Sequence, residues 1–377
     1  MGIAVILAVM GAMAQTPAEG SCLERVAKTL ELARADIGAM VPVAEKAAAL
    51  LAQGGKLYAA GQPSLVSEIS GRAGGIMMIR PLAGTAPEAG DVVLYTPESG
   101  VETPESLRDT KALVVVFGGA MKGHDGPAFS NHAQETGISP TLANAIPAWL
   151  FTGELVAALT RLGKMPVIYE TIGAYGGYPR MAKYKSGEIA FHDDCTVPPC
   201  AAGTLARACV DTVTALLRRI EKEERAQLDQ AGAWVREARK NQKQLFMYSM
   251  GHLFPDEVAG TDIGRLFHSA GWNAGFRVAH PEDDYHDGDL AVHICYQHPT
   301  DVLLRKARPA GARVVYVSLF ADRDFTKDNG VIWIDPMWNW PDACVTLEGY
   351  DVPLLPASGV INGAIAWEIY RLGMGPA

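Results

Sequence analysis

The sequence lacks several features that would place it outside the globular class. It has no low-complexity tract, and 49% of its 377 residues are hydrophobic, which is enough to bury one or two full cores. This composition excludes intrinsic disorder and fibrous architectures. The chain has no run of Lys or Arg, and 42 acidic residues against 33 basic ones give it a formal net charge of -9. Because this balance repels a polyphosphate, we do not expect nucleic acid as a partner.

Long hydrophobic runs are also missing, apart from one at the start of the chain. Ile3–Ala14 is too short to span a bilayer but suits the apolar region of a secretory signal, with Ala12 and Ala14 as the small residues before Gln15. No Lys or Arg precedes it. We therefore expect a signal peptide over residues 1–14, no membrane span, and a secreted or periplasmic protein. The alternative is a buried N-terminal helix or strand.

Motifs for nucleotide and hydrolase chemistry are absent. The glycines of GGAMKGHDG (118–126) do not form G-x-x-x-x-G-K-[ST], and no G-x-G-x-x-G follows a predicted strand. There is no G-x-S-x-G elbow, which disfavours an α/β-hydrolase. We expect no cofactor.

Two segments contain side chains that can bind metal ions, but neither has the ligands and spacing of a known metal site. Cys195 and Cys200 flank two prolines near His192, which is short of the four ligands of structural zinc. Export would permit a disulfide between these cysteines, and two free thiols are the alternative. The acidic turn His280–Asp289 could bind a divalent cation, but its spacing fits no EF-hand and such turns are usually just solvated. We expect no metal.

What the sequence does contain is an internal repeat. Each half has a helical stretch, a short strand that runs into a glycine, a Gly-Asp turn that leads into an apolar strand, a further β-branched strand, and an apolar helix with a similar hexapeptide. The paired segments are 22–53 and 203–241, 56–60 and 244–250, 90–95 and 288–293, 112–117 and 312–317, and NAIPAW (144–149) and NGAIAW (362–367).

The alternation of strands and helices in each half predicts the fold class. Parallel strands need crossover connections, and right-handed crossovers place helices on both faces of a sheet. We expect an α/β protein with two doubly wound parallel-sheet domains of flavodoxin type, at residues 22–164 and 203–377. The irregular segment 165–202 is the predicted linker, and an irregular segment of this length is more often functional or interfacial than idle.

This order of elements resembles a tandem pair of sugar isomerase (SIS) domains, as in the isomerase half of glucosamine-6-phosphate synthase. GDVVLYTPESGVETPESL (90–107) and GDLAVHICYQHPTDVLL (288–304) look like the second strand and the Ser-x-Ser-Gly-x-Thr loop of that family. The resemblance implies binding of a sugar or sugar phosphate, isomerase-type activity and a possible homodimer. The repeat could instead provide that pairing within one chain.

Loops at the carboxyl ends of the strands carry the candidate ligand-binding residues. Hydroxyls, backbone N–H groups and helix N-termini at this edge suit an anionic or polyhydroxyl ligand. In the second half the serines of the pattern are replaced, which puts a second phosphate site in doubt. The candidates are Gly61, Ser64, Ser67, Ser99, Gly100 and Thr103 in the first half, and Gly251, Gln297 and Thr300 in the second.

Isomerisation of an aldose to a ketose needs a base that moves a proton between adjacent carbons. The candidate catalytic residues are Glu68, His252 and His298, close to the same loops. Loop histidines can equally cap helices or bond locally. Two other functions stay open: a non-catalytic exported sugar-binding or sensing protein, and a hydrolase or lyase in which a histidine such as His124 is the base.

Three tryptophans, Trp333, Trp338 and Trp340, lie close together in VIWIDPMWNWPD (331–342). They could stack on a sugar ring or seal the contact between the halves, and we favour the contact because aromatic residues dominate such interfaces.

Overall fold

The structure is a computed structural model. It describes residues 19–84, 86–98, 103–119, 125–171, 176–249, 253, 257, 260–270, 284–296, 303–319 and 328–375.

Each half of the chain forms one five-stranded parallel sheet. The first has the strand order β2-β1-β3-β4-β5, and the second, taken from its other edge, has the order β7-β6-β8-β9-β10. The strands of the first sheet are β1 (Leu57–Gly61), β2 (Arg80–Pro81), β3 (Val92–Thr96), β4 (Leu113–Phe117) and β5 (Ala128–Phe129). Those of the second are β6 (Leu245–Ser249), β7 (His268–Ala270), β8 (Leu290–Ile294), β9 (Arg313–Val317) and β10 (Val331–Ile334). A small antiparallel ribbon joins β11 (Ala343–Val345) to β12 (Leu354–Pro356).

The two sheets repeat each other in order and in register. The central pair of the first sheet begins with Leu57 opposite Val92, and that of the second begins with Leu245 opposite Leu290. The strands predicted at 56–60, 90–95 and 112–117, with their counterparts in the second half, are therefore confirmed. So is the predicted fold class, α/β with one parallel sheet in each half.

The Gly-Asp turns of the repeat have a structural reason. The carboxylate of Asp91 accepts hydrogen bonds from the backbone N–H groups of Lys56 (2.8 Å) and Glu88 (2.9 Å). Asp289 accepts equivalent bonds from Gln244 (2.9 Å) and His286 (2.8 Å). Each aspartate thus ties the start of one strand to the turn before its neighbour, and it satisfies backbone donors that would otherwise have no partner.

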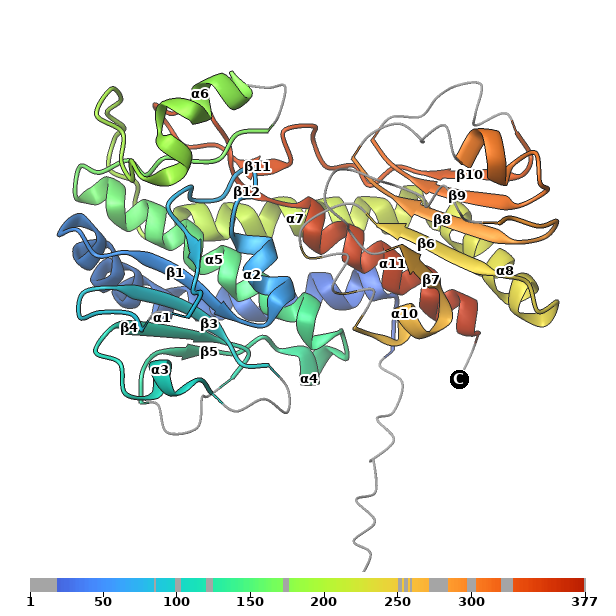
Figure 1. Cartoon of the computed structure of the whole chain (residues 1–377), viewed down its shortest axis with the longest axis horizontal. Coiled ribbons are helices and arrows are strands. Elements are labelled where there is room, and N and C mark those ends of the chain that lie inside the picture. Colours follow the sequence, from blue (N-terminus) through green and yellow to red (C-terminus); the bar gives the residue numbers. More distant parts are fainter. Residues whose placement is uncertain are drawn as a thin grey trace, which may run out of the picture.

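The two sheets lie at opposite ends of the molecule, and α7 (Thr204–Glu223) and α11 (Ser358–Met374) run between them (Figure 1). In chain order the helices are α1 (Cys22–Ala52), α2 (Pro63–Ile69), α3 (Glu105–Arg108), α4 (Ala133–Thr136), α5 (Pro140–Arg161), α6 (Gly177–Lys183), α7, α8 (Arg225–Lys240), α10 (Asp262–Leu266) and α11. A 3₁₀ turn spans Lys185–Gly187, and a π-helical turn spans Leu303–Ala307.

The helices α1, α5, α7 and α11 form a layer to which both halves contribute. Helix α1 begins at a capping box in which Ser21 and Glu24 satisfy each other's backbone N–H groups, and it packs on α5, α7 and α11. Helix α5 is long and apolar enough to cross a membrane by length and composition, but its most apolar stretch is fully buried within the protein. It is therefore placed as the central core helix of the first half.

The predicted helical stretch 203–241 is two helices, because α7 ends at Glu223 and α8 begins at Arg225. Helix α7 packs on α1 and α5, whereas α8 packs on α11, so the chain changes direction to bury both apolar faces. The segment 165–202 carries α6 and pairs with the first half through the bond from Met77 N–H to the Val167 carbonyl (2.8 Å). The predicted boundaries at 164 and 203 stay predictions.

All six cysteines are free. Of the two alternatives for Cys195 and Cys200, the structure thus has two free thiols and not the disulfide. The predicted signal peptide lies outside the described residues.

Candidate functional site

The carboxyl ends of β1 and β3 lie side by side at one edge of the first sheet. Gly61 is paired with Thr96, and the N–H of Gln62 donates to the Thr96 carbonyl at 3.0 Å. Gly61 has a φ of +93°, and a Cβ atom there would overlap the Thr96 carbonyl oxygen. The glycine is required here because it lets the chain turn from β1 into α2 directly against β3.

Two buried hydroxyls at these strand ends have no hydrogen-bond partner within the described chain. They belong to Ser64, in the first turn of α2, and to Thr96, the last residue of β3, which are 2% and 0% exposed. A buried hydroxyl without a bond is unfavourable by about 1–3 kcal/mol. Both groups are free to bond a polar ligand that enters this edge.

A row of side-chain amides runs along the same edge. The amide of Asn144, on α5, donates to the Gln62 side chain (3.0 Å) and accepts from the Asn131 side chain (2.6 Å). Gln62 in turn donates to the Thr141 hydroxyl at 2.8 Å. Since Gln62 follows β1 and Asn131 follows β5, these bonds cross the ends of the intervening strands. We call Gln62, Asn131, Thr141 and Asn144 the amide floor.

A second glycine makes room for this floor. Gly118 follows β4 with a φ of +98°, and a Cβ atom there would overlap the side-chain oxygen of Asn144. Glycines at the ends of β1 and β4 thus bring backbone and amide groups together at the sheet edge.

The predicted ligand-binding residues of the first half do not all lie in one place. Gly61 and Ser67 line a hollow of about 450 Å³ between α2 and the β1–β2 edge. Ser64 is buried on the same helix, and Thr103 lies before α3 with intermediate exposure. Ser99 and Gly100 lie outside the described residues.

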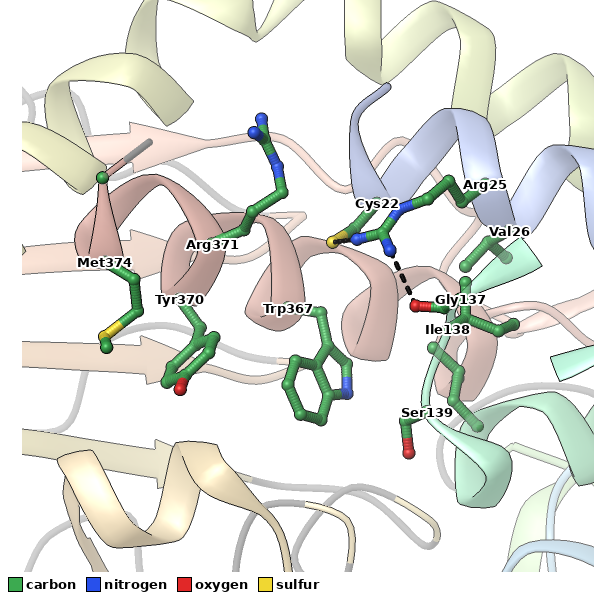
Figure 2. Close-up of a pocket in the computed structure, with 12 residues that line it drawn as sticks. Cys22, Arg25, Val26, Gly137, Ile138, Ser139, Trp367, Tyr370, Arg371 and Met374 are labelled. Carbon is green, nitrogen blue, oxygen red and sulfur yellow. Dashed lines mark hydrogen bonds between the residues drawn. The ribbon is translucent and has the colours of Figure 1, made fainter. Parts of the chain in front are cut away.

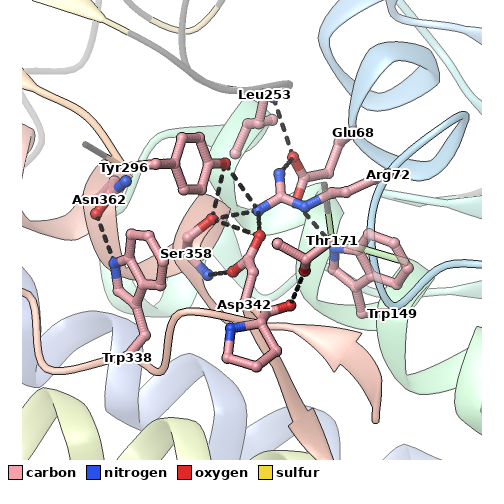
Figure 3. Close-up of polar contacts among 11 residues, drawn as sticks. Glu68, Arg72, Trp149, Thr171, Leu253, Tyr296, Trp338, Asp342, Ser358 and Asn362 are labelled. Atoms are coloured by element: carbon pink, nitrogen blue, oxygen red, sulfur yellow. Dashed lines mark hydrogen bonds and ion pairs between the residues drawn. The ribbon is translucent and has the colours of Figure 1, made fainter. Parts of the chain in front are cut away.

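Glu68, a predicted catalytic residue, lies in a fully buried polar network (Figure 3). Its carboxylate accepts from the Arg72 guanidinium, from Trp149 Nε1 at 3.0 Å and from the Leu253 N–H at 3.0 Å. Burial raises the pKa of Glu68, and the charge of Arg72 opposes that rise. The carboxylate faces these partners and is not exposed to solvent, and its proposed role in catalysis stays a prediction.

The network of Glu68 links the two halves of the chain. Arg72, itself 1% exposed, donates to Asp342 (2.9 Å) and to the Ser358 hydroxyl, both from the second half. The Tyr296 hydroxyl lies 3.0 Å from that of Ser358. Two carboxylates surround one guanidinium, so its charge is compensated by residues from both halves.

Glu257 is the counterpart of Glu68 in the second half. It is fully buried and accepts from Trp367 Nε1 at 2.7 Å, as Glu68 accepts from Trp149. The second carboxylate oxygen of Glu257 is buried and has no hydrogen-bond partner within the described chain. Burial raises the pKa of Glu257, and the nearby neutral groups of Ser139, Trp367 and Thr141 oppose this rise. Glu257 thus contacts the N-terminus of α5 close to the amide floor.

The corresponding edge of the second sheet is filled by an aromatic residue. Asn362 occupies the position of Asn144 in the repeat, but its side-chain oxygen accepts from Trp338 Nε1 at 3.2 Å. Trp338 is 2% exposed and packs edge-on against Tyr296, with ring centroids 5.1 Å apart. Of the three clustered tryptophans, Trp338 thus packs inside the second half, next to the residues that contact the first.

Five further predicted site residues, all in the second half, lie outside the described residues: Gly251, His252, Gln297, His298 and Thr300. The same holds for His124. The hypotheses that rest on them stay predictions.

Sequence reasoning missed the amide floor and Arg72. For Asn144 a signal was present, because this residue opens one of the two similar hexapeptides of the repeat. The sequence contains no comparable signal for Gln62, Asn131 or Arg72. No group of three or more His, Cys, Asp or Glu side chains that could hold a metal ion occurs among the described residues.

The fold defines the class of this protein, which is α/β with two repeated parallel sheets. This is the architecture that the resemblance to tandem SIS domains predicts.

Comparison with known proteins gives similarity of structure only. No family model and no curated protein matches the chain. Among solved structures, the C-terminal domain of glucosamine-fructose-6-phosphate aminotransferase from Francisella tularensis is 11% identical with a TM-score of 0.46, covering 95% of this chain and 97% of that one. A structure described as a "putative phosphosugar isomerase" from Silicibacter pomeroyi DSS-3 is 12% identical, with a TM-score of 0.46 and coverage of 94% and 97%. A "putative sugar binding protein" from Salmonella typhimurium LT2 is 10% identical, with a TM-score of 0.48 and coverage of 94% and 98%. These similarities extend over both halves and assign no activity to this chain.

Proposed function

We propose that this protein binds a sugar or sugar phosphate at the carboxyl edge of its first sheet. The observation that carries the proposal is the pair of buried hydroxyls of Ser64 and Thr96, at adjacent strand ends, which bond to nothing in the described chain. Ligands of open α/β sheets bind outside the carboxyl ends of the strands, where these hydroxyls lie.

The amide floor supports a polyhydroxyl ligand. A primary amide offers both donors and acceptors, and sugar hydroxyls also do both. Asn144 is held on both sides by other amides, so its orientation is fixed before a ligand arrives. Such preorganisation lowers the free energy lost on binding.

The difference between the two halves supports a single sugar site, in the first half. In the second half the Trp338 indole N–H donates to the Asn362 side-chain oxygen, in the place of the Asn131 amide that donates to Asn144. Among the described residues of the second half, this position therefore holds an aromatic ring and not an amide. The altered loops of the second half agree with this asymmetry.

Equivalent asparagines in the two halves provide a matched test. Binding of fructose 6-phosphate, fructose and inorganic phosphate is measured by calorimetry with the wild type, Asn144→Ala and Asn362→Ala. We expect Asn144→Ala to weaken sugar binding roughly tenfold, since a lost hydrogen bond contributes about 1–1.5 kcal/mol. Asn362→Ala is expected to leave it unchanged. Absence of binding to all three probes, or equal effects of the two substitutions, would refute the proposal.

A second candidate function, aldose–ketose isomerisation, is favoured by Glu257. A buried carboxyl group with a raised pKa, in contact with the helix that carries the floor, is the kind of group that transfers protons in enzymes. In this case Glu257→Gln abolishes interconversion of fructose 6-phosphate and glucose 6-phosphate but preserves binding. Turnover by Glu257→Gln at the wild-type rate would exclude this role, and turnover lost only in Glu68→Gln would favour Glu68 instead.

We also propose that the protein is exported, on the basis of the apolar run Ile3–Ala14. N-terminal sequencing of the protein recovered from the periplasm or medium tests this, and an intact Met1 would contradict it. The dimer implied by the resemblance is tested by sedimentation.

A further inference from the structure

A second cavity lies between α1, the turn before α5, and α11 (Figure 2). Its volume is about 480 Å³, which is within the range of small-molecule sites. Its lining combines two guanidinium groups, those of Arg25 and Arg371, with mainly apolar and aromatic groups. These include Arg25, Ser139, Leu142, Trp367, Tyr370 and Met374.

Arg25 brings an uncompensated positive charge to this cavity. Its guanidinium donates to the Gly137 carbonyl at 2.7 Å and to the sulfur of Cys22 at 2.8 Å, and within the described residues it pairs with no carboxylate. Its Nε–H is buried and has no acceptor. Burial raises the pKa of the Cys22 thiol to about 11, so this thiol is neutral at physiological pH.

Arg371, the other arginine of the cavity, differs from Arg25 in this respect. Both ends of its guanidinium bond to the Glu368 carboxylate, at 2.9 and 2.6 Å. The charge available to a ligand is therefore that of Arg25, and a partly buried guanidinium favours a carboxylate that can accept two of its hydrogen bonds.

Two aromatic rings of α11 form one wall. Trp367 and Tyr370 pack edge to face, with centroids 5.5 Å apart and planes at 80°. The bond from Trp367 Nε1 to the buried Glu257 fixes the indole plane. Leu142 and Met374 add apolar surface. A flat ring gains both apolar burial and favourable ring contacts at such a wall.

We propose that this cavity binds a small monocarboxylate that carries an aromatic ring. The carboxylate pairs with Arg25, and the ring packs against Trp367 and Tyr370. The proposed sugar site does not use Arg25, although Ser139 and Leu142 of this cavity flank Thr141 of the amide floor.

The test uses phenylacetate and its neutral analogue phenylacetamide, measured by calorimetry and ligand-observed NMR on the full chain. We expect phenylacetate to bind at least roughly tenfold more tightly than phenylacetamide, because only the carboxylate forms a charge-assisted hydrogen bond with Arg25. Arg25→Gln should remove this preference. Arg34→Gln is the matched control, since Arg34 lies on the same helix and is already paired with Glu31 (2.9 Å) and with Asp211.

A second variant guards against misfolding of Arg25→Gln. Met374 is 43% exposed, so Met374→Trp fills the cavity from its rim without disturbing Arg25 or the core. Loss of phenylacetate binding in Met374→Trp, with an unchanged thermal midpoint and unchanged binding of fructose 6-phosphate, would support the site. Equal affinity for phenylacetate and phenylacetamide, no detectable binding of phenylacetate, or binding unchanged in both variants would overturn it.

Discussion

Glu68 and Glu257 have equivalent surroundings, and each lies between a helix of its own half and a helix of the other half. Each accepts a hydrogen bond from the tryptophan of the last helix of its own half, Trp149 or Trp367. Each also lies near the N-terminus of the last helix of the other half, since Glu68 is next to Gly359 and Glu257 is close to Ser139. The two glutamates differ in charge compensation, because among the described residues only Glu68 is paired with an arginine.

The first prediction concerns this difference. Glu68→Gln leaves Arg72 with one carboxylate in a buried site, and we expect a loss of about 3 kcal/mol in the free energy of unfolding. Glu257→Gln replaces a carboxyl that has only neutral partners, and we expect a change below about 1 kcal/mol at pH 5. Urea denaturation of both variants gives the comparison, and equal losses would contradict it.

The second prediction is a pH dependence from Glu257. Burial raises its pKa in the folded state above the ordinary value of 4.5, so the folded state holds the proton more tightly than the unfolded chain. The unfolded state then binds fewer protons as pH rises above that value, and this group lowers stability with increasing pH until the folded pKa is passed.

We therefore expect the stability of Glu257→Gln, relative to wild type, to rise as the pH increases above 4.5, by at most about 1.4 kcal/mol per pH unit, until the raised pKa of Glu257 is passed. Urea denaturation at several pH values measures this difference. A difference that is constant with pH would show that Glu257 titrates normally in the folded protein.

The third prediction compares two helical glycines. A Cβ atom at Gly359 would overlap the Glu68 carboxylate, so Gly359→Ala is expected to destabilise the protein by about 1–3 kcal/mol. Gly38, in α1, has nothing within 4 Å of an added Cβ atom. Gly38→Ala should therefore stabilise the helix by about 0.5–1 kcal/mol. Thermal unfolding of both variants measures these effects, and a stable Gly359→Ala would mean that the Glu68 network shifts easily.

The fourth prediction separates function from stability at the first sheet. Ser64→Ala and Thr96→Val remove hydroxyls that have no bond in the described chain. Their removal should be neutral or stabilising, because no partner loses a bond, while binding of fructose 6-phosphate should fall. Chemical denaturation and calorimetry on the same preparations test this. A loss of stability with unchanged sugar binding would indicate a purely structural role.

The sequence alone determined the strands, the repeat and the fold class of this protein. These depend on local patterns: β-branched runs such as Leu113–Phe117, and Gly-Asp turns whose aspartates bond to backbone close by. Local patterns of this kind suffice because strand burial and turn chemistry are decided within a few residues.

The candidate site was accessible to sequence reasoning only in part. Gly61 and Ser64 could be placed at a strand end, because a strand followed by a glycine and a helix predicts that edge. The amide floor could not, since Gln62 and Asn144 are 82 residues apart and asparagine or glutamine alone carries no motif.

Only the tertiary structure decided which polar groups meet in the core. Arg72 bonds to Glu68 four residues away and to Ser358 at a separation of 286 residues, and Trp338 lies beside Asn362 where the first half has amides. A buried charge or amide is stabilised only by the partners that packing brings to it, and packing of α1, α5, α7 and α11 depends on the whole chain. The sequence therefore determined where the sheet edges are, and the packed helices decided which edge has the linked amides and the two buried hydroxyls without a partner in the described chain.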